Sequence, residues 1–387
     1  MSIKSKLDSL FGHGGKLEKL HPVYDMFATM IFVFPTRTNS GAHIRDNNDI
    51  KRVMMTVIIA LIPAFLFGIY NSGLQHYTSL GQSASHIDII IKGSWLVIPI
   101  LIVSYGVGGF WEMLFAVVRR HEINEGFLVT GFLIPLIVPS TIPLWQVAVA
   151  TSFGVVVGKE VFGGTGMNIF NPALVTRAFL FFAYPAAISG NEVWTSFGKT
   201  IVDTYTKATP LSVAAAVKDG TIIDSLEKSG YSMWKIFVGT IPGSIGETST
   251  AAIIIGAIIL LVTGIASWRI LLSVFAGGYL MALVFNYAAP SPSHFMALPA
   301  HYHLIMGGFA FGAVFMATDP VSSSQTNTGK YIYGFLIGSL AVLVRVINPA
   351  YPEGMMLAIL FMNACAPLLD STVVWFNIRR RKKRATK

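Results

Sequence analysis

The chain has 387 residues, of which 53% are hydrophobic and only 12% are charged, and its mean hydropathy is +0.62. A soluble domain carries roughly 25% charged residues, so this composition excludes a soluble globular protein and indicates a polytopic membrane protein. The net charge of +9 does not indicate nucleic-acid binding, because the basic residues gather at the chain ends and in short loops, as membrane topology requires.

The first 52 residues are polar, of mixed charge, and interrupted by Gly-His-Gly-Gly at 12–15. They do not have the pattern of a cleavable signal peptide. We therefore expect a cytoplasmic amino-terminal segment over 1–52.

Apolar runs close to membrane-spanning length predict ten transmembrane helices, some short enough to be broken helices buried in a bundle. The expected spans are 53–70, 95–118, 127–142, 144–158 and 172–188, followed by 251–266, 269–288, 303–317, 331–347 and 354–376. The predicted fold is an all-α polytopic membrane protein with five-helix halves over 53–188 and 251–376. The polar loop 189–250 separates the halves, and a basic tail covers 377–387.

Two similar apolar runs indicate an inverted repeat. Asn124-Glu125-Gly126 opens one run that reaches Trp145, and Gly246-Glu247-Thr248 opens another that reaches Trp268. Repeats with an odd number of helices insert in opposite senses, which gives a bundle with a central site built from broken helices. The alternative is chance similarity between two runs rich in Leu and Ile.

Basic residues in short loops set the expected orientation. With ten membrane crossings, the basic loop residues and the basic tail all fall on the same side of the membrane. These residues are Lys51, Arg52, Arg119, Arg120, Lys159 and Arg269. We expect that side to be the cytoplasm, with both termini inside and the loop 189–250 outside.

The longest polar interval contains the run Asp-Thr-Tyr-Thr-Lys-Ala-Thr-Pro-Leu at 203–211. An exposed hydroxyl near an acid that could bind a metal–nucleotide donor is a candidate for covalent modification, and Thr209 is that candidate. In the alternative interpretation the run is a turn that ends at Pro210, with Asp203 and the threonines bonding local backbone groups.

A glycine-rich stretch, Gly-Gly-Thr-Gly-Met-Asn-Ile-Phe-Asn-Pro, lies at 163–172. It lacks the Lys-Ser/Thr pair and the βαβ context of a phosphate-binding loop. The amides of Asn168 and Asn171 offer donors and acceptors that match the edge of an isoalloxazine or a quinone. The alternative is that these amides cap helix ends.

Acidic residues at or within the spans are functional candidates, because burying a charge costs a few kcal/mol. Glu112 is the deepest, and Asp319 and Asp370 lie nearer to span ends. Carboxylates suit a hard cation such as Na+. The alternative role, an interfacial cap or a pair with a neighbouring Lys or Arg, is expected for Glu160 and Glu353 and is not expected for Glu112 or Asp319.

Gly108 and Gly109 precede Glu112 in the second predicted span. Such a pair allows close helix approach, and it equally allows a flat ring to lie against the backbone. Nothing in the local sequence decides between these interpretations.

The single cysteine, Cys365, lies in an apolar stretch, so the chain contains no internal disulfide and no Cys-ligated iron–sulfur or zinc site. If electrons pass through this chain, organic cofactors must carry them.

Seven blocks occur in order: Gly-Val-Gly-Gly-Phe-Trp-Glu at 106–112, His-Glu-Ile-Asn-Glu-Gly-Phe at 121–127, Lys-Glu-Val-Phe-Gly-Gly-Thr-Gly at 159–166, Asn-Pro-Ala-Leu at 171–174, Ile-Pro-Gly-Ser-Ile-Gly-Glu at 241–247, Ala-Thr-Asp-Pro-Val-Ser at 317–322 and Asn-Pro-Ala-Tyr-Pro-Glu-Gly-Met-Met at 348–356. Together they resemble the NqrB/RnfD family, and within it the NqrB subunits of the Na+-translocating NADH:quinone oxidoreductases. The resemblance runs from the amino-terminal Gly-Gly-Lys stretch to the basic tail.

The resemblance implies covalent FMN on Thr209. The family signature is Asp-x-x-Ser/Thr-Gly-Ala-Thr/Ser, which Asp203, Thr206 and Ala208 match and Lys207 does not. Weaker alternative acceptors are Thr248, Ser249 and Thr250, because none has an Asp six residues before it.

The resemblance also implies roles for three further groups. Asn168 and Asn171 would contact non-covalent riboflavin, and Gly108 and Gly109 would contact quinone. Acids implicated in Na+ uptake or coupling would be Glu112, Asp319 and Asp370, of which Glu112 and Asp319 are the candidate Na+ ligands.

The implied function is a subunit of a redox-driven sodium pump in a bacterial inner membrane, passing electrons from NADH through FMN and riboflavin to quinone. Implied partners are an NADH dehydrogenase subunit with FAD and an iron–sulfur centre, a second FMN-bearing subunit and two small membrane subunits. Two alternatives stay open: a passive solute channel or transporter with an inverted repeat, and an Rnf-type subunit linked to ferredoxin.

Overall fold

The structure is a computed structural model that describes residues 50–120, 126–188, 195, 208–348 and 353–385. These residues form helices and no β-strand, which confirms the predicted all-α membrane fold. Helical residues lie in each of the ten ranges predicted as spans.

The first half contains two long helices followed by shorter ones. In chain order they are α3 (Ile50–Ser79), α4 (His86–Arg119), α5 (Gly126–Leu136), α6 (Leu144–Val156), η2 (Glu160–Phe162), α7 (Pro172–Ala183) and α8 (Pro185–Ile188). The described part of the central loop forms α9 (Pro210–Ala216), α10 (Ile222–Lys228) and α11 (Met233–Val238).

The second half begins with a short helix and ends with a long one. Its elements are α12 (Thr250–Val262), α13 (Trp268–Ala288), η3 (Phe295–Ala297), α14 (Ala300–Ile305), α15 (Phe309–Phe311), η4 (Gly312–Met316), α16 (Asn327–Ile347) and α17 (Met355–Ala385). The span predicted over 303–317 is therefore broken, and Gly307 lies at the break with a φ of +64°.

Five helices among the described residues are long and apolar enough to cross a membrane: α3, α4, α13, α16 and α17. The apolar helices α5 and α12 have 11 and 13 residues, so each extends only about 17 to 20 Å of the roughly 30 Å hydrocarbon layer. Short helices of this kind are stable in a membrane only where other helices surround them.

The two halves meet where α5 ends and α12 is about to begin. The Gly246 amide donates to the Leu136 carbonyl at 2.7 Å, and the Ile245 amide donates to the Val138 carbonyl at 3.2 Å. A Cβ at Gly246 would lie 2.7 Å from the Leu136 side chain, so only glycine permits this approach. The backbone groups freed by the broken helices thus bond each other across the joint.

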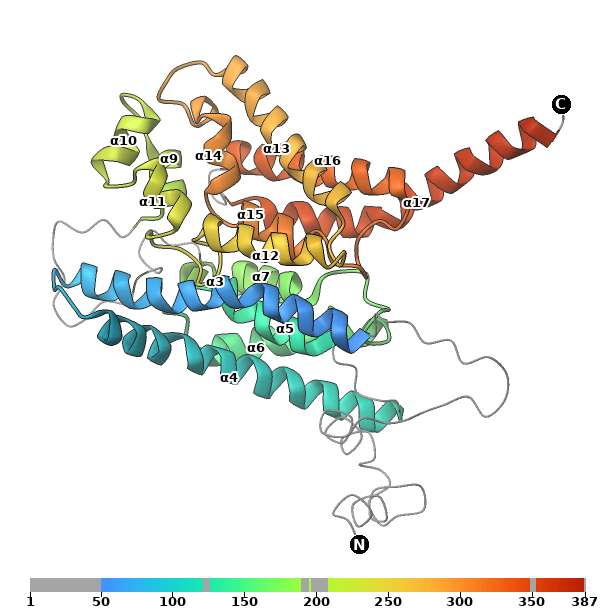
Figure 1. The fold of residues 1–387 in the computed structure, drawn as a ribbon, viewed down its shortest axis with the longest axis horizontal. Helices are drawn as coiled ribbons and strands as arrows, with labels where there is room; N and C mark the ends of the chain where they lie inside the picture. The colour runs from blue at the N-terminus through green and yellow to red at the C-terminus, as the bar shows by residue number, and fades with distance from the viewer. Residues whose placement is uncertain (1–49, 121–125, 189–194, 196–207, 349–352, 386–387) are drawn as a thin grey trace, which may run out of the picture.

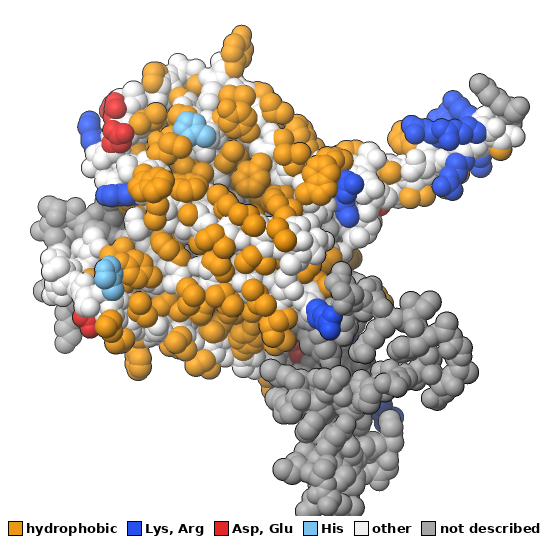
Figure 2. Space-filling model, viewed as in Figure 1, with side chains coloured by type: hydrophobic (Ala, Val, Ile, Leu, Met, Phe, Trp, Pro, Cys, Tyr) orange, Lys and Arg blue, Asp and Glu red, His pale blue; other side chains and the backbone are white. Residues whose placement is uncertain are grey.

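The helices run between two distinct ends of the bundle. Figure 1 shows α9, α10 and α11 at one end, and the beginning of α3, the end of α4 and the basic end of α17 at the other. Hydrophobic side chains spread over the face between these ends, while lysines and arginines lie toward the ends and on the projecting part of α17 (Figure 2). This distribution suits a body surrounded by lipid.

Candidate functional site

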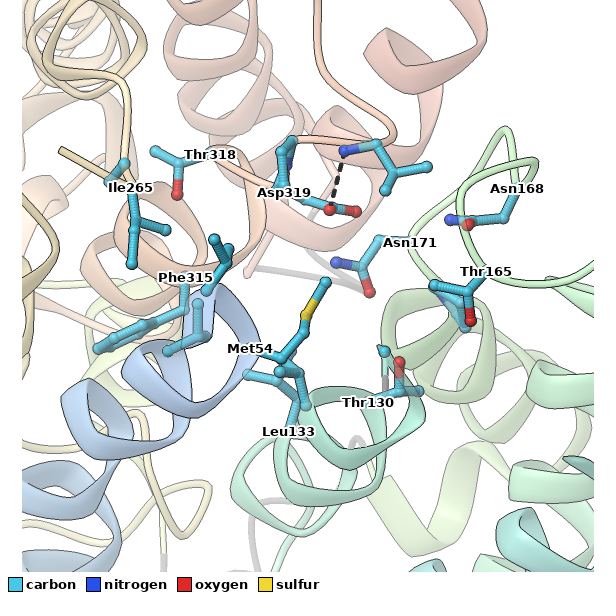
Figure 3. Close-up of a pocket in the computed structure, with 18 of the residues that line it drawn as sticks. Met54, Thr130, Leu133, Thr165, Asn168, Asn171, Ile265, Phe315, Thr318 and Asp319 are labelled. Carbon is cyan, nitrogen blue, oxygen red and sulfur yellow. Dashed lines mark hydrogen bonds between the residues drawn. The ribbon is translucent and has the colours of Figure 1, made fainter. Parts of the chain in front are cut away.

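A pocket of about 80 Å³ lies between the two halves, near the beginning of α3. Its walls come from α3, α5, the glycine-rich loop, the end of α12 and the segment that joins η4 to α16 (Figure 3). Its polar lining residues are Thr130, Lys159, Thr165, Asn168, Asn171, Thr318 and Asp319, among apolar side chains such as Met54, Leu133 and Phe315. A few polar groups among apolar ones are typical of ligand pockets.

Glycines shape the loop that supplies one wall of this pocket. Gly163, Gly164 and Gly166 have φ values of +119°, +96° and +90°, a conformation that other residues rarely adopt. Arg119 at the end of α4 holds the loop by donating to the Glu160 carboxylate at 3.3 Å and to its carbonyl at 2.7 Å. Of the two roles expected for Glu160, a cap or an ion pair, the structure shows the ion pair.

The two asparagines make local hydrogen bonds and also line the pocket. The Asn171 side-chain oxygen accepts from the amides of Ala173 at 3.0 Å and Leu174 at 3.3 Å, so this residue caps α7. Asn168 donates to the Phe170 carbonyl at 2.9 Å. The capping interpretation is thus right for Asn171, and its amide nitrogen is not used by the cap.

Thr165 lies beside these amides in Figure 3. Its hydroxyl is buried and has no hydrogen-bond partner among the described residues. A buried hydroxyl without a partner is rare, because it loses its hydrogen bonds to water and gains none. A polar ligand or a water molecule in the pocket would satisfy it.

Asp319 supplies a carboxylate on the opposite wall, as Figure 3 shows. It accepts from the Val321 amide at 3.2 Å and from the Ser322 hydroxyl at 2.7 Å. Burial raises the pKa of Asp319, although these two hydrogen bonds act in the opposite direction. The Asp319 carboxylate therefore closes a local turn with Val321 and Ser322.

Glu112 does not stand alone, and here the prediction from sequence was wrong. The Lys159 ammonium donates to the Glu112 carboxylate in a buried ion pair, with the two residues 2% and 6% exposed. The two residues are 47 positions apart, so no local pattern joins them. Lys159 also lines the pocket, and it therefore connects Glu112 to the pocket wall.

Gly108 and Gly109 differ in their surroundings. A Cβ at Gly108 would lie 2.2 Å from the Phe127 ring, so the glycine is required for α4 to pack on α5. A Cβ at Gly109 would come no closer than 4.0 Å to that ring. Close helix approach explains Gly108, and space remains beside Gly109.

Asp370 has a dense set of hydrogen bonds. Its carboxylate accepts from the Ser324 hydroxyl, the Gln325 amide, and both the amide and the hydroxyl of Thr326, at 2.6 to 2.9 Å. These contacts fasten α17 to the start of α16. Among the described residues, no three His, Cys, Asp or Glu side chains are arranged to hold a metal ion, so Glu112, Asp319 and Asp370 do not form one cluster.

Thr209 lies at the other end of the bundle, at the N-cap of α9. Thr209 is half-buried, and its hydroxyl accepts from the Ser212 amide at 3.2 Å and donates to the Ser212 hydroxyl at 3.0 Å. The Ala208 carbonyl accepts from Tyr231 at 2.7 Å. Asp203 and Thr206 lie outside the described residues.

The alternative acceptors Thr248, Ser249 and Thr250 are all buried, with exposures of 2% to 6%. Asn71 donates to Thr248 at 3.4 Å, and Ser249 caps α12. A modifying enzyme would have to open the joint between the halves to reach them. Their burial leaves Thr209 as the accessible hydroxyl of the set.

A buried charge cluster was not anticipated from the sequence. Arg177 of α7 donates to the carboxylates of both Glu247 and Glu353, and so ties the first half to the second. Of the two roles expected for Glu353, a cap or an ion pair, the structure shows the ion pair, with a partner 176 positions away. Arg345 is fully buried nearby and donates to the carbonyls of His303 at 2.7 Å and Met306 at 3.2 Å, where α14 breaks. The Arg that precedes the apolar run Ala-Phe-Leu-Phe-Phe was the available signal for Arg177.

Comparison of the sequence with known proteins identifies relatives of this chain. Residues 37–379 match the sequence model of the NQR2, RnfD, RnfE family. The chain belongs to this family. It is 50% identical to the NqrB subunit of the Na(+)-translocating NADH-quinone reductase of Chromohalobacter salexigens, over 99% of this chain and 97% of that one. The resemblance that the seven sequence blocks indicated is thereby confirmed.

Further relatives carry the same name. The NqrB subunit of Stutzerimonas stutzeri is 48% identical over 99% of this chain and all of its own length. That of Klebsiella pneumoniae is 48% identical over 98% of each chain. Such full-length similarity extends over both helix halves and the pocket between them.

Proposed function

We propose that this chain is the membrane subunit of a redox-driven sodium pump, in which electrons from NADH pass through FMN on Thr209 and riboflavin to quinone while Na+ is exported. The observation that carries the proposal is the pocket of Figure 3, because a family of NADH–quinone reductase subunits needs an electron carrier within the membrane. A flavin would supply that chemistry, since it exchanges one or two electrons.

The lining of the pocket fits the polar edge of a flavin ring. The Asn171 amide nitrogen is a donor that the helix cap does not use, and the Thr165 hydroxyl can donate or accept. The apolar side chains of Met54, Leu133 and Phe315 would contact the ring after the pocket walls move apart, because a cavity of about 80 Å³ is smaller than a flavin ring. Riboflavin held by Asn168 and Asn171 is the occupant that we propose.

The position of Thr209 supports a second flavin at the opposite end of the bundle. Thr209 is only half-buried, whereas Thr248, Ser249 and Thr250 are buried. We place that end in the periplasm and both termini in the cytoplasm, since the basic end of α17 lies at the other end (Figure 1). The membrane would be the bacterial inner membrane.

Quinone would bind beside Gly109, where the helix surface leaves space, and Glu112, Asp319 and Asp370 would serve Na+ uptake. The remaining electron carriers would belong to partners: a subunit with FAD and an iron–sulfur centre, and a second FMN-bearing subunit. Two small membrane subunits would complete the complex. The exposed apolar side chains of α4, such as Ile91 at 63% and Trp95 at 77%, leave surface for them or for lipid.

In-gel fluorescence under ultraviolet light tests the proposal. The complex is produced together with its flavin transferase, denatured and separated by electrophoresis. We expect a fluorescent band for the wild type and for Ser212→Ala, and none for Thr209→Ala. Ser212 is the matched control because its hydroxyl lies 3.0 Å from that of Thr209. A dark wild-type band would contradict the proposal and favour a passive transporter.

A further inference from the structure

Lys159 is the residue of the pocket whose position the proposed function does not explain. Its side chain lines the pocket and is nevertheless only 2% exposed. The ammonium donates to Glu112 of α4 and lies 5.9 Å from the centre of the Phe127 ring. A cation thus stands in the wall between the pocket and the acid of α4.

The Lys159 side chain lies between two sets of groups that can accept a hydrogen bond from its ammonium. On one side is Glu112, the acceptor that the structure shows. On the other side the pocket holds the Asn171 amide and the Asp319 carboxylate, and Asp319 bonds Val321 and Ser322. The neighbouring cation Arg119 is engaged by Glu160, so it does not compete for Glu112.

We propose that Lys159 is an exchangeable counter-ion that is shared between Glu112 and the flavin of the pocket, and that it leaves Glu112 open to Na+ when it turns toward the flavin. The inference rests on the proposed function, because it requires a flavin in the pocket. Lys159 is here a positioning residue for Na+, since it controls whether Glu112 has a partner.

The physical reason is charge balance around a buried ion pair. A reduced flavin holds more negative charge than an oxidised one, so a nearby ammonium favours the reduced form. The flexible stem of lysine allows the ammonium to change partners without moving the backbone. Glu112 would then be a buried carboxylate without a counter-ion, a costly state that a small cation relieves. Electron arrival and Na+ binding would therefore stabilise each other.

Redox titration of the riboflavin in the purified whole complex, with and without Na+, tests this inference. In the wild type we expect Na+ to make reduction easier. In Lys159→Met reduction should become at least tenfold less favourable, which is about 30 mV for a two-electron couple, and the effect of Na+ should disappear. Lys159→Arg keeps the charge and should stay near the wild type.

Glu112→Gln gives a second test with the opposite sign. It removes the competitor for the ammonium, so riboflavin should become easier to reduce, and Na+ should have no further effect. Glu112→Gln also tests the inference on its own if the Lys159→Met chain does not assemble into the complex. Lys228→Met removes a lysine from an exposed site on α10, at the opposite end of the bundle from the pocket (Figure 1), and is the matched control, with an unchanged potential expected.

The outcomes separate this inference from the function on which it rests. A wild-type complex that yields no riboflavin on extraction would contradict the proposed function. Variants that retain riboflavin and keep the wild-type potential and the wild-type response to Na+ would overturn the role of Lys159 alone. Opposite shifts in Lys159→Met and Glu112→Gln would support it.

Discussion

Removing Arg177 should destabilise the fold strongly, because one guanidinium serves two buried carboxylates. In Arg177→Met, Glu247 and Glu353 lose this partner while the Glu247 side chain is only 6% exposed and the Glu353 side chain only 15%. Removal of one partner of a buried ion pair costs about 3 to 5 kcal/mol. At about 1.4 kcal/mol for each factor of ten, the lower figure already shifts the folding equilibrium more than a hundredfold.

The assay is thermal unfolding of the purified chain in detergent. With about 2.1 cal/mol/K of unfolding entropy per residue over 387 residues, a loss of about 3 kcal/mol lowers the melting temperature by roughly 4 °C. Lys228→Met, at an exposed site on α10, is the control and should not change it. Replacing Arg177, Glu247 and Glu353 together by Met, Gln and Gln should recover most of the loss, since no unpaired charge remains. A triple variant as unstable as the single one would refute this reasoning.

Three further predictions follow from single contacts. Gly108→Ala should cost about 1 to 3 kcal/mol of stability through its contact with Phe127, and Phe127→Leu in the same chain should restore part of it, as melting temperatures would show. Asp370→Ala should cost about 2 to 3 kcal/mol because the hydroxyl and amide donors at the start of α16 lose a charged acceptor; an unchanged melting temperature would exclude that role. Burial raises the pKa of Asp319, so the ionised form opposes folding. Asp319→Asn should therefore gain stability over the wild type as the pH rises above about 4, and denaturation at several pH values that shows no such trend would contradict it.

The positions of the helices could be predicted because membrane burial requires long apolar runs. α13 over Trp268–Ala288 and α16 over Asn327–Ile347 lie close to their predicted ranges of 269–288 and 331–347. The break between α14 and α15 was not predicted, although Gly307-Gly308 marked it in the sequence. Hydropathy measures how apolar a run is, and it does not show where a helix stops within it.

The charge pairs could not be predicted because their partners are far apart in the chain. Glu112 meets Lys159 across 47 positions, and Arg177 meets Glu247 across 70. Sequence periodicity shows which residues share one helix face, but it does not show which faces pack together. For Glu160 a cap or a pair with a basic residue was expected, because Glu160 lies near a span end, and the structure shows the pair with Arg119. The inverted repeat stays a prediction.

The central claim is that Thr209 carries a flavin, and mass spectrometry of one peptide tests it most directly. Trypsin cleaves after Lys207 and Lys218 and releases residues 208–218, which contain both Thr209 and Ser212. From a complex produced with its flavin transferase, we predict a mass increase of one FMN less one water, located on Thr209 by fragmentation. An unmodified peptide, or a flavin on Ser212, would contradict the claim.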